Sequence, residues 1–291
     1  MDILPQLIIN GIIAGSIYAL AALGLTLIFG VLGFVNFAYG DMIIVGAYLY
    51  FVFLVLLGIP WFVSVPLAVA SLVIIALVLE RTTFRPVRNA DPMTPLIISV
   101  GVAFALRSLL DIIFKSNLRT FTTEISEGIP ILSGMARVTS NQLLIIGLSL
   151  ISILALFLFL KYTKIGKAIR AVSDNRMVAE ILGINVNRYI KVVFAISAIL
   201  ACIAGILIGY ENYLLPTRGV TVGIKAFAAI IFGGVGSLPG ALLGGFIIGL
   251  GENILPGLDI VSTGYKDSIA FFILIIIMLI RPRGLFGISK S

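Results

Sequence analysis

The residues with the strongest chemical character are concentrated in one stretch, Lys164–Lys191, which holds six basic and two acidic residues in a mostly apolar chain. Asp174 or Asn175 can cap a helix, because a short polar side chain accepts hydrogen bonds from the first free backbone N–H groups. Gly183 can end that helix in the left-handed conformation. The stretch thus predicts a helix of about two turns, with an apolar face formed by Val178, Ile181 and Leu182.

Two roles fit this amphipathic helix on its basic loop. Its apolar face could dock into a groove of a partner protein. Alternatively, the basic flank could lie on anionic lipid, with about 1 kcal/mol of attraction from each of Lys161, Lys164 and Lys167. The piece from Asp174 to Gly183 carries mixed charge, which lipid attraction explains less well. Docking is therefore favoured.

Catalytic chemistry has no comparable signature in this sequence. There is no apparent nucleophile–base pair, carboxylate dyad or G-x-x-x-x-G-K-[ST] phosphate loop, and the nearest match, Ile165–Ala168, lacks the preceding glycine and the hydroxyl. The chain has no His and a single Cys, Cys202, so a His/Cys metal site and an internal disulfide are excluded. We predict no catalytic residue, metal or cofactor on this chain, and no nucleotide hydrolysis by it.

The composition indicates the class of protein. Apolar residues make up 60% of the chain and charged residues 11%, whereas soluble domains average about 25% charged residues. About 20 apolar residues cross the hydrocarbon of a bilayer. We predict an all-α, polytopic integral membrane protein with one domain over residues 1–291 and no cleavable signal peptide. The eight expected hydrophobic segments are 6–30, 37–57, 61–79, 94–114, 142–160, 190–210, 222–252 and 263–280.

Basic residues predict the orientation, because Lys and Arg collect in cytoplasmic loops. Loops 80–93 and 161–191 are both basic and are separated by two segments, so both are expected in the cytoplasm. Arg281, Arg283 and Lys290 would place the C-terminus there as well. Eight simple crossings would instead leave the C-terminus outside, so one segment after the sixth must be irregular.

Residues 222–252 are the expected irregularity. They are too long for one plain helix and too short for two full spans, and a Gly/Pro cluster interrupts them. A re-entrant segment that enters and leaves by one face would return the C-terminus to the cytoplasm, provided that protein or water shields its backbone. The alternative is a kinked helix that crosses the membrane. In both cases we expect a translocation path near Gly233, Gly234, Gly236 and Ser237.

A second irregular place is Gly33–Met42, where polar groups interrupt two apolar runs. It could be a short turn with Asp41 near a helix start, where a carboxylate is favoured. It could equally be an unwound piece whose backbone faces a polar substrate. On the second interpretation, Asn36, Tyr39 and Gly40 line the path. The preceding small residues Gly11, Gly15, Ala19 and Ala22 recur every three or four positions, which favours close helix packing over a pore.

The charges inside the segments give little indication of function from the sequence alone. Arg107 and Asp111 lie four residues apart and could pair, but their place near a segment end favours extension to the membrane interface. Glu252 and Glu211 also lie at the ends of segments, so pairing and extension to the interface are again the two interpretations. No charge is expected clearly at the bilayer midplane, which weakens the hypothesis of a carrier driven by protons or sodium ions.

Four stretches together resemble a known family. The stretches GSIYALAALGLTLIFGVLGFVNFAYGD, GKAIRAVSDNRMVAEILGINV, KAFAAIIFGGVGSLPGALLGG and RPRGLFG are similar, in this order, to the permease subunits of branched-chain amino acid ABC importers of the LivH type. The resemblance covers nearly the whole chain. Tyr39 stands where the family often has His, which bears on any substrate role of that position.

The resemblance implies a prokaryotic inner-membrane subunit that works with a second related permease, two cytoplasmic ATPases and an external binding protein. ATP would be used by the partners, and no nucleic acid is involved. Ala179 to Gly183 would form the core of a coupling helix seated on the ATPase. Related permeases carry urea, sugars or nucleosides, so those substrates remain alternatives. A self-sufficient channel or secondary carrier is the other functional class.

Overall fold

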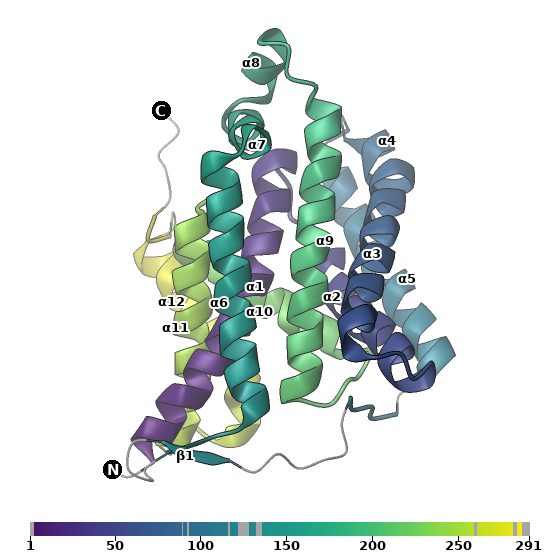
Figure 1. The fold of residues 1–291 in the computed structure, drawn as a ribbon. Helices are drawn as coiled ribbons and strands as arrows, with labels where there is room; N and C mark the ends of the chain where they lie inside the picture. The colour runs from purple at the N-terminus through teal and green to yellow at the C-terminus, as the bar shows by residue number, and fades with distance from the viewer. Residues whose placement is uncertain are drawn as a thin grey trace.

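A computed structural model describes residues 3–88, 90–91, 93–115, 117–121, 128–131, 136–258, 261–281 and 284–286 of the chain. Most of these residues are helical (Figure 1). The longer helices are α1 (Leu4–Leu32), α2 (Ala38–Phe51), α3 (Trp61–Leu79), α5 (Met93–Phe114), α6 (Ser140–Tyr162), α7 (Lys164–Asp174), α9 (Val186–Glu211), α10 (Arg218–Gly233), α11 (Leu238–Gly257) and α12 (Lys266–Ile280). This confirms the all-α polytopic class.

Short elements complete the fold. Two π-helical turns, η1 (Val52–Leu56) and η2 (Glu80–Phe84), extend α2 and α3, and α4 (Arg85–Val87) follows η2. Strands β1 (Ile129–Ile131) and β2 (Ala136–Val138) pair in antiparallel register, with Ile129 opposite Val138. The remaining elements are α8 (Arg176–Ile181) and the 3-10 turn η4 (Thr263–Tyr265).

Seven helical runs among the described residues are long and apolar enough to cross a membrane. Six correspond to the first six expected segments. The seventh is α11, while α10, of 16 residues, and α12, of 15 residues, are shorter than such a span. The expected count of eight is thus approximate, because residues 222–252 divide between two helices, of which α11 alone is a full span, and α12 is too short to be one.

The bundle has two distinct ends in Figure 1: α4, α7 and α8 lie at one, here called the α8 end, and β1 lies at the other, the β1 end. The start of α1 lies at the β1 end, where the Gln6 side chain donates to the Arg137 carbonyl oxygen at 3.1 Å. Loops 80–93 and 161–191, the two basic loops, share the α8 end. Arg88 joins them by donating to Asn187 at 2.6 Å. Arg283 and Lys290 lie outside the described residues.

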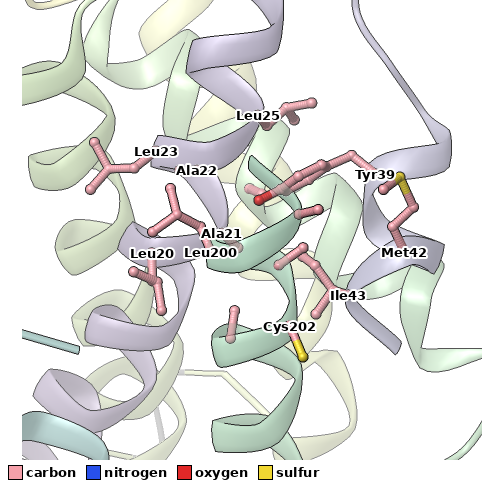
Figure 2. Packing of buried hydrophobic residues seen from close by; sticks show 14 of the residues in the cluster. Leu20, Ala21, Ala22, Leu23, Leu25, Tyr39, Met42, Ile43, Leu200 and Cys202 are labelled. Carbon is pink, nitrogen blue, oxygen red and sulfur yellow. The ribbon is translucent and has the colours of Figure 1, made fainter. Parts of the chain in front are cut away.

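The central helices are α1, α2 and α9, whose most apolar windows are 67–78% buried, against 17–28% for α3, α5 and α6. The small-residue stripe on α1 allows this packing. Gly11 and Gly15 lie against the backbones of Leu250 and Phe246 on α11, so a side chain at either position would collide. Cys202 is buried against Gly46 in the same core (Figure 2). The stripe therefore serves packing, as expected.

Residues 222–252 form a helical hairpin rather than one kinked helix. Helices α10 and α11 are antiparallel, since Gly233 meets Gly240 near the turn and Ala229 meets Gly244 further along. Gly234 and Gly236 adopt positive φ angles of 97° and 87° in the turn, and the Ser237 side chain caps α11 by accepting from Gly240 N at 3.2 Å. Because the Gly/Pro cluster forms a turn between two complete helices, the kinked-helix alternative is wrong.

The hairpin turn lies toward the α8 end. Gly236 and Leu238 line the same small cavity as Arg170 and Ser173 of α7. The chain beyond α12 returns to this turn, where the Leu285 and Phe286 N–H groups donate to the carbonyl oxygens of Phe232 and Gly233 at 3.0 and 2.9 Å. Helix α12 thus brings the chain back to the end that carries the basic loops.

Candidate functional site

Helix α8 extends beyond the ends of the long helices of the bundle (Figure 1). Asn175 caps it, because its side-chain oxygen accepts from Val178 N at 3.1 Å. Gly183 follows it with φ +79°, the left-handed conformation in which glycine is favoured. Ile181 and Leu182 expose 78% and 72% of their surface, and Met177 and Val178 are also exposed. These four exposed side chains, called the apolar cap of α8 here, have no packing role within the chain.

Three details of the coupling prediction change. Asn175 rather than Asp174 is the cap, since Asp174 ends α7, and the six residues of α8 make about the two turns expected. Ala179 is only 1% exposed, so it packs within this chain and cannot seat on a partner. Met177, which the sequence interpretation omitted, joins the exposed face. Its apolar type beside Val178 was the available signal.

A cavity of about 220 Å³ lies between the start of α2, α5 and α10. It is called the apolar cavity here. Phe37, Phe104 and Phe227 line it together with the polar Asn36 and Asp41. Asn36 is buried, and its Oδ1 accepts from Ala38 N at 3.1 Å while its Nδ2 has no hydrogen-bond partner among the described residues. The unwound stretch before α2 thus presents a free donor beside this cavity.

The predicted path residues separate into three places. Asn36 and Gly40 line the apolar cavity. Tyr39 points toward α1 and α9, where its hydroxyl donates to the Ser197 carbonyl oxygen at 3.2 Å (Figure 2). Gly233, Gly234, Gly236 and Ser237 belong to the hairpin turn, and Gly236 lines the cavity of about 190 Å³ beside α7. The structure does not bring the two predicted groups together.

Asp41 and Arg107 form an ion pair at the edge of the apolar cavity. The Arg107 guanidinium donates to both Asp41 carboxylate oxygens at 3.1 and 3.0 Å, a two-point contact that is stronger than a single hydrogen bond. The expectation that Arg107 extends to the membrane interface is therefore wrong. Its partner on α2 is 66 residues away in sequence, and no local spacing could have revealed it.

A second ionic group lies toward the β1 end. Lys225 of α10 is buried and donates to Glu252 at 2.5 Å, to Asp267 at 2.7 Å and to the Tyr18 hydroxyl at 3.1 Å. Lys225 and Glu252 thus place charges in the interior of the bundle. The sequence interpretation overlooked Lys225, although a lone lysine in an apolar run is an unusual feature that usually has a function.

These ionic residues border a hollow of about 430 Å³, called the polar cavity here. It lies among α1, α9, α10, α11 and the start of α12. Thr221, Val222 and Lys225 of α10 face it, whereas Gly219, Val220 and Gly223 face the apolar cavity. One short helix therefore separates the two cavities. Gly219 and Gly223 allow it to lie directly against Gly40.

The chain matches a known protein family over most of its length. The family described as "Branched-chain amino acid transport system / permease component" matches residues 7–278. The chain belongs to this family. It is accordingly a multi-pass protein of the inner membrane and a transport permease.

Individual relatives agree with the family over nearly full length. The chain is 34% identical to the high-affinity branched-chain amino acid transport system permease protein BraD of Pseudomonas aeruginosa, covering 97% of this chain and 95% of the relative. It is 33% identical to LivH of Escherichia coli, with the same coverage. The ribose import permease protein RbsC of Haemophilus influenzae is 35% identical over only 43% of this chain.

Proposed function

We propose that this chain is the membrane-spanning permease subunit of an ATP-driven ABC importer for branched-chain amino acids. The full-length similarity to BraD and LivH supports the substrate class. The exposed apolar cap on α8 carries the proposal that energy comes from a partner. Water disfavours an exposed apolar patch, and such patches mark interaction sites. Because the cap lies at the end that holds the basic loops, its partner is cytoplasmic.

The proposed assembly contains two cytoplasmic ATPases, a second related permease and an external substrate-binding protein. The sequence holds no phosphate-binding loop, so nucleotide binding falls to the ATPases. Val178, Ile181 and Leu182, with Met177, form the contact face. Asn175 and Gly183 set the start and end of α8, and Asp174 joins it to α7. Lipid contacts the basic flank.

The hairpin turn would transmit the coupling. Gly236 and Leu238 line the cavity that Ser173 and Asp174 also line, directly before α8. Ser173 further donates to the Gly30 carbonyl oxygen at 2.9 Å, which ties α7 to the end of α1. A displacement of α8 by an ATPase would thus reach both α1 and the hairpin. Through them it reaches the apolar cavity, which Asn36 and Gly40 line.

Reconstitution tests this function directly. Proteoliposomes with the chain, its sister permease and the ATPases should accumulate radiolabelled leucine when ATP is inside and the loaded binding protein is outside. The same vesicles without ATP, or with this chain alone, should accumulate none. ATP-dependent uptake of ribose but not leucine would support the sugar-permease alternative. Uptake by this chain alone would show a channel or secondary carrier.

The orientation gives a separate prediction. In a Cys202→Ser background, single cysteines at Arg85 and Arg170 should resist a membrane-impermeant thiol reagent added to intact cells, because both lie at the α8 end. A cysteine at Ile129 in β1, which is half-exposed at the opposite end, should react. All three should react in permeabilised cells, which is the control. Labelling of Arg170→Cys in intact cells would reverse the proposed orientation.

A further inference from the structure

The polar cavity has the size and position of a ligand site. Its volume of about 430 Å³ falls within the roughly 300–1,000 Å³ of small-molecule pockets. It lies toward the β1 end, the external end in the proposed orientation, and five helical elements contribute to its wall. It therefore lies on the side where a solute would enter the permease during import.

The charges around this cavity balance. Three cationic side chains line it, from Arg218, Lys225 and Lys266, and three anionic ones, from Glu211, Glu252 and Asp267. A lining of one sign would attract a counter-ion of the other sign. A lining that offers both signs, as this one does, is complementary to a molecule that carries both.

Glu252 has a carboxylate oxygen available for such a molecule. The residue is 1% exposed, and its Oε2 has no hydrogen-bond partner in the described part of the chain. Lys225 cannot supply that bond, because its three N–H groups are directed to Glu252 Oε1, Asp267 and Tyr18. A buried carboxylate oxygen without a donor costs free energy. A ligand ammonium group would satisfy it.

Arg218 offers the opposite charge in the same lining. Its guanidinium lies 4.3 Å from the centre of the Tyr213 ring, which holds the side chain at the start of α10. A guanidinium can bind a carboxylate through two parallel hydrogen bonds. Lys266, which donates to Asn253 at 3.2 Å, adds a second cation.

Part of the remaining wall is aliphatic, and polar side chains such as Asn10, Thr221 and Asn253 form the rest. Ile17 of α1, Ile208 of α9 and Val222 of α10 line the cavity and are nearly inaccessible to solvent. Burial of a branched side chain against such a surface contributes about 25 cal/mol for each Å² removed from water. The cavity thus combines charges of opposite sign with an aliphatic patch on its wall.

We propose that the polar cavity binds a zwitterionic aliphatic amino acid, with its ammonium on Glu252, its carboxylate on Arg218 and its side chain against Ile17, Ile208 and Val222. This deepens the proposed function and rests on it. The permease would then select its substrate itself, on the external side of α10. Selection would not depend on the binding protein alone.

Direct binding to the purified permease–ATPase complex, without binding protein, tests this site. Radiolabelled leucine should bind saturably. Unlabelled leucine should compete, whereas 4-methylpentanoate, which lacks the ammonium, and isoamylamine, which lacks the carboxylate, should compete at least tenfold more weakly. Glu252→Gln and Arg218→Gln should each weaken leucine binding at least tenfold. Asp91→Asn, the same kind of change at an exposed loop residue, should leave binding unchanged.

Several outcomes would overturn the site while leaving the function intact. Unchanged leucine binding in Glu252→Gln would mean that Oε2 meets only water. Equal competition by all three compounds would show that the site does not recognise the ammonium and carboxylate of the ligand. If Glu252→Gln is not recovered as folded protein, Arg218→Gln at the cavity edge decides the matter by the same measurement. Wild-type vesicles without ATP-driven leucine uptake would instead overturn the proposed function itself.

Discussion

Replacing Leu182 with aspartate should separate this permease from its ATPases without unfolding it. The Leu182 side chain is 72% exposed, so a carboxylate there remains in water in the isolated chain. In the assembled transporter it would enter an apolar groove, where an unpaired charge costs several kcal/mol. Since about 1.4 kcal/mol is a factor of ten in affinity, ATPase binding should weaken by at least about a hundredfold. Co-purification of the ATPases, followed by ATP-dependent leucine uptake, measures this.

The basic flank supplies the matched control. Lys164→Gln and Lys167→Gln remove lipid attraction of only about 1 kcal/mol per charge and should leave the ATPases bound. Loss of the ATPases in these variants, with retention in Leu182→Asp, would show that the loop binds lipid and does not dock. Ala179 gives no such test, because it is buried and an aspartate there would disturb α8 itself. Gly183 is equally unsuitable, since its φ of +79° strains any side chain.

The sequence predicted what depends on local patterns. Runs of apolar residues located the membrane helices, and Asn175 and Gly183 located the cap and end of α8 within one or two residues. The stripe on α1 predicted close packing, because small residues at helical spacing let two helices approach closely. In each case the information lies within a few turns of one helix.

What the sequence did not predict depends on contacts between distant helices. Asp41 meets Arg107, and Lys225 meets Glu252, through the arrangement of the bundle. The burial of Ala179 follows from α8 folding back on its own chain, which amphipathic spacing cannot reveal. The polar cavity was missed for the same reason, since α1, α9, α10, α11 and α12 each contribute only a few of its residues. Its one local signal was a lysine inside an apolar run.

The close contact within the hairpin predicts that a single added methyl group there lowers the stability of the protein. Gly233→Ala should destabilise the protein by about 1–3 kcal/mol, the usual cost of overpacking a close contact. The new Cβ would collide with the Gly240 carbonyl group and Ala241 N, which are backbone atoms and cannot rotate away. The apparent melting temperature in detergent should fall, and leucine uptake should fall with it.

Gly101→Ala is the matched control for this change. Gly101 lies in α5 with no atom within 4 Å of a new Cβ, so alanine there meets open space. Alanine is favoured over glycine in a helix by about 1 kcal/mol, and this variant should melt at or above the wild-type temperature. Equal melting temperatures for the two variants would contradict the close approach of α10 to α11. Opposite shifts in melting temperature from the same added methyl group would show that the hairpin contact, rather than helix propensity, determines the stability of this part of the fold.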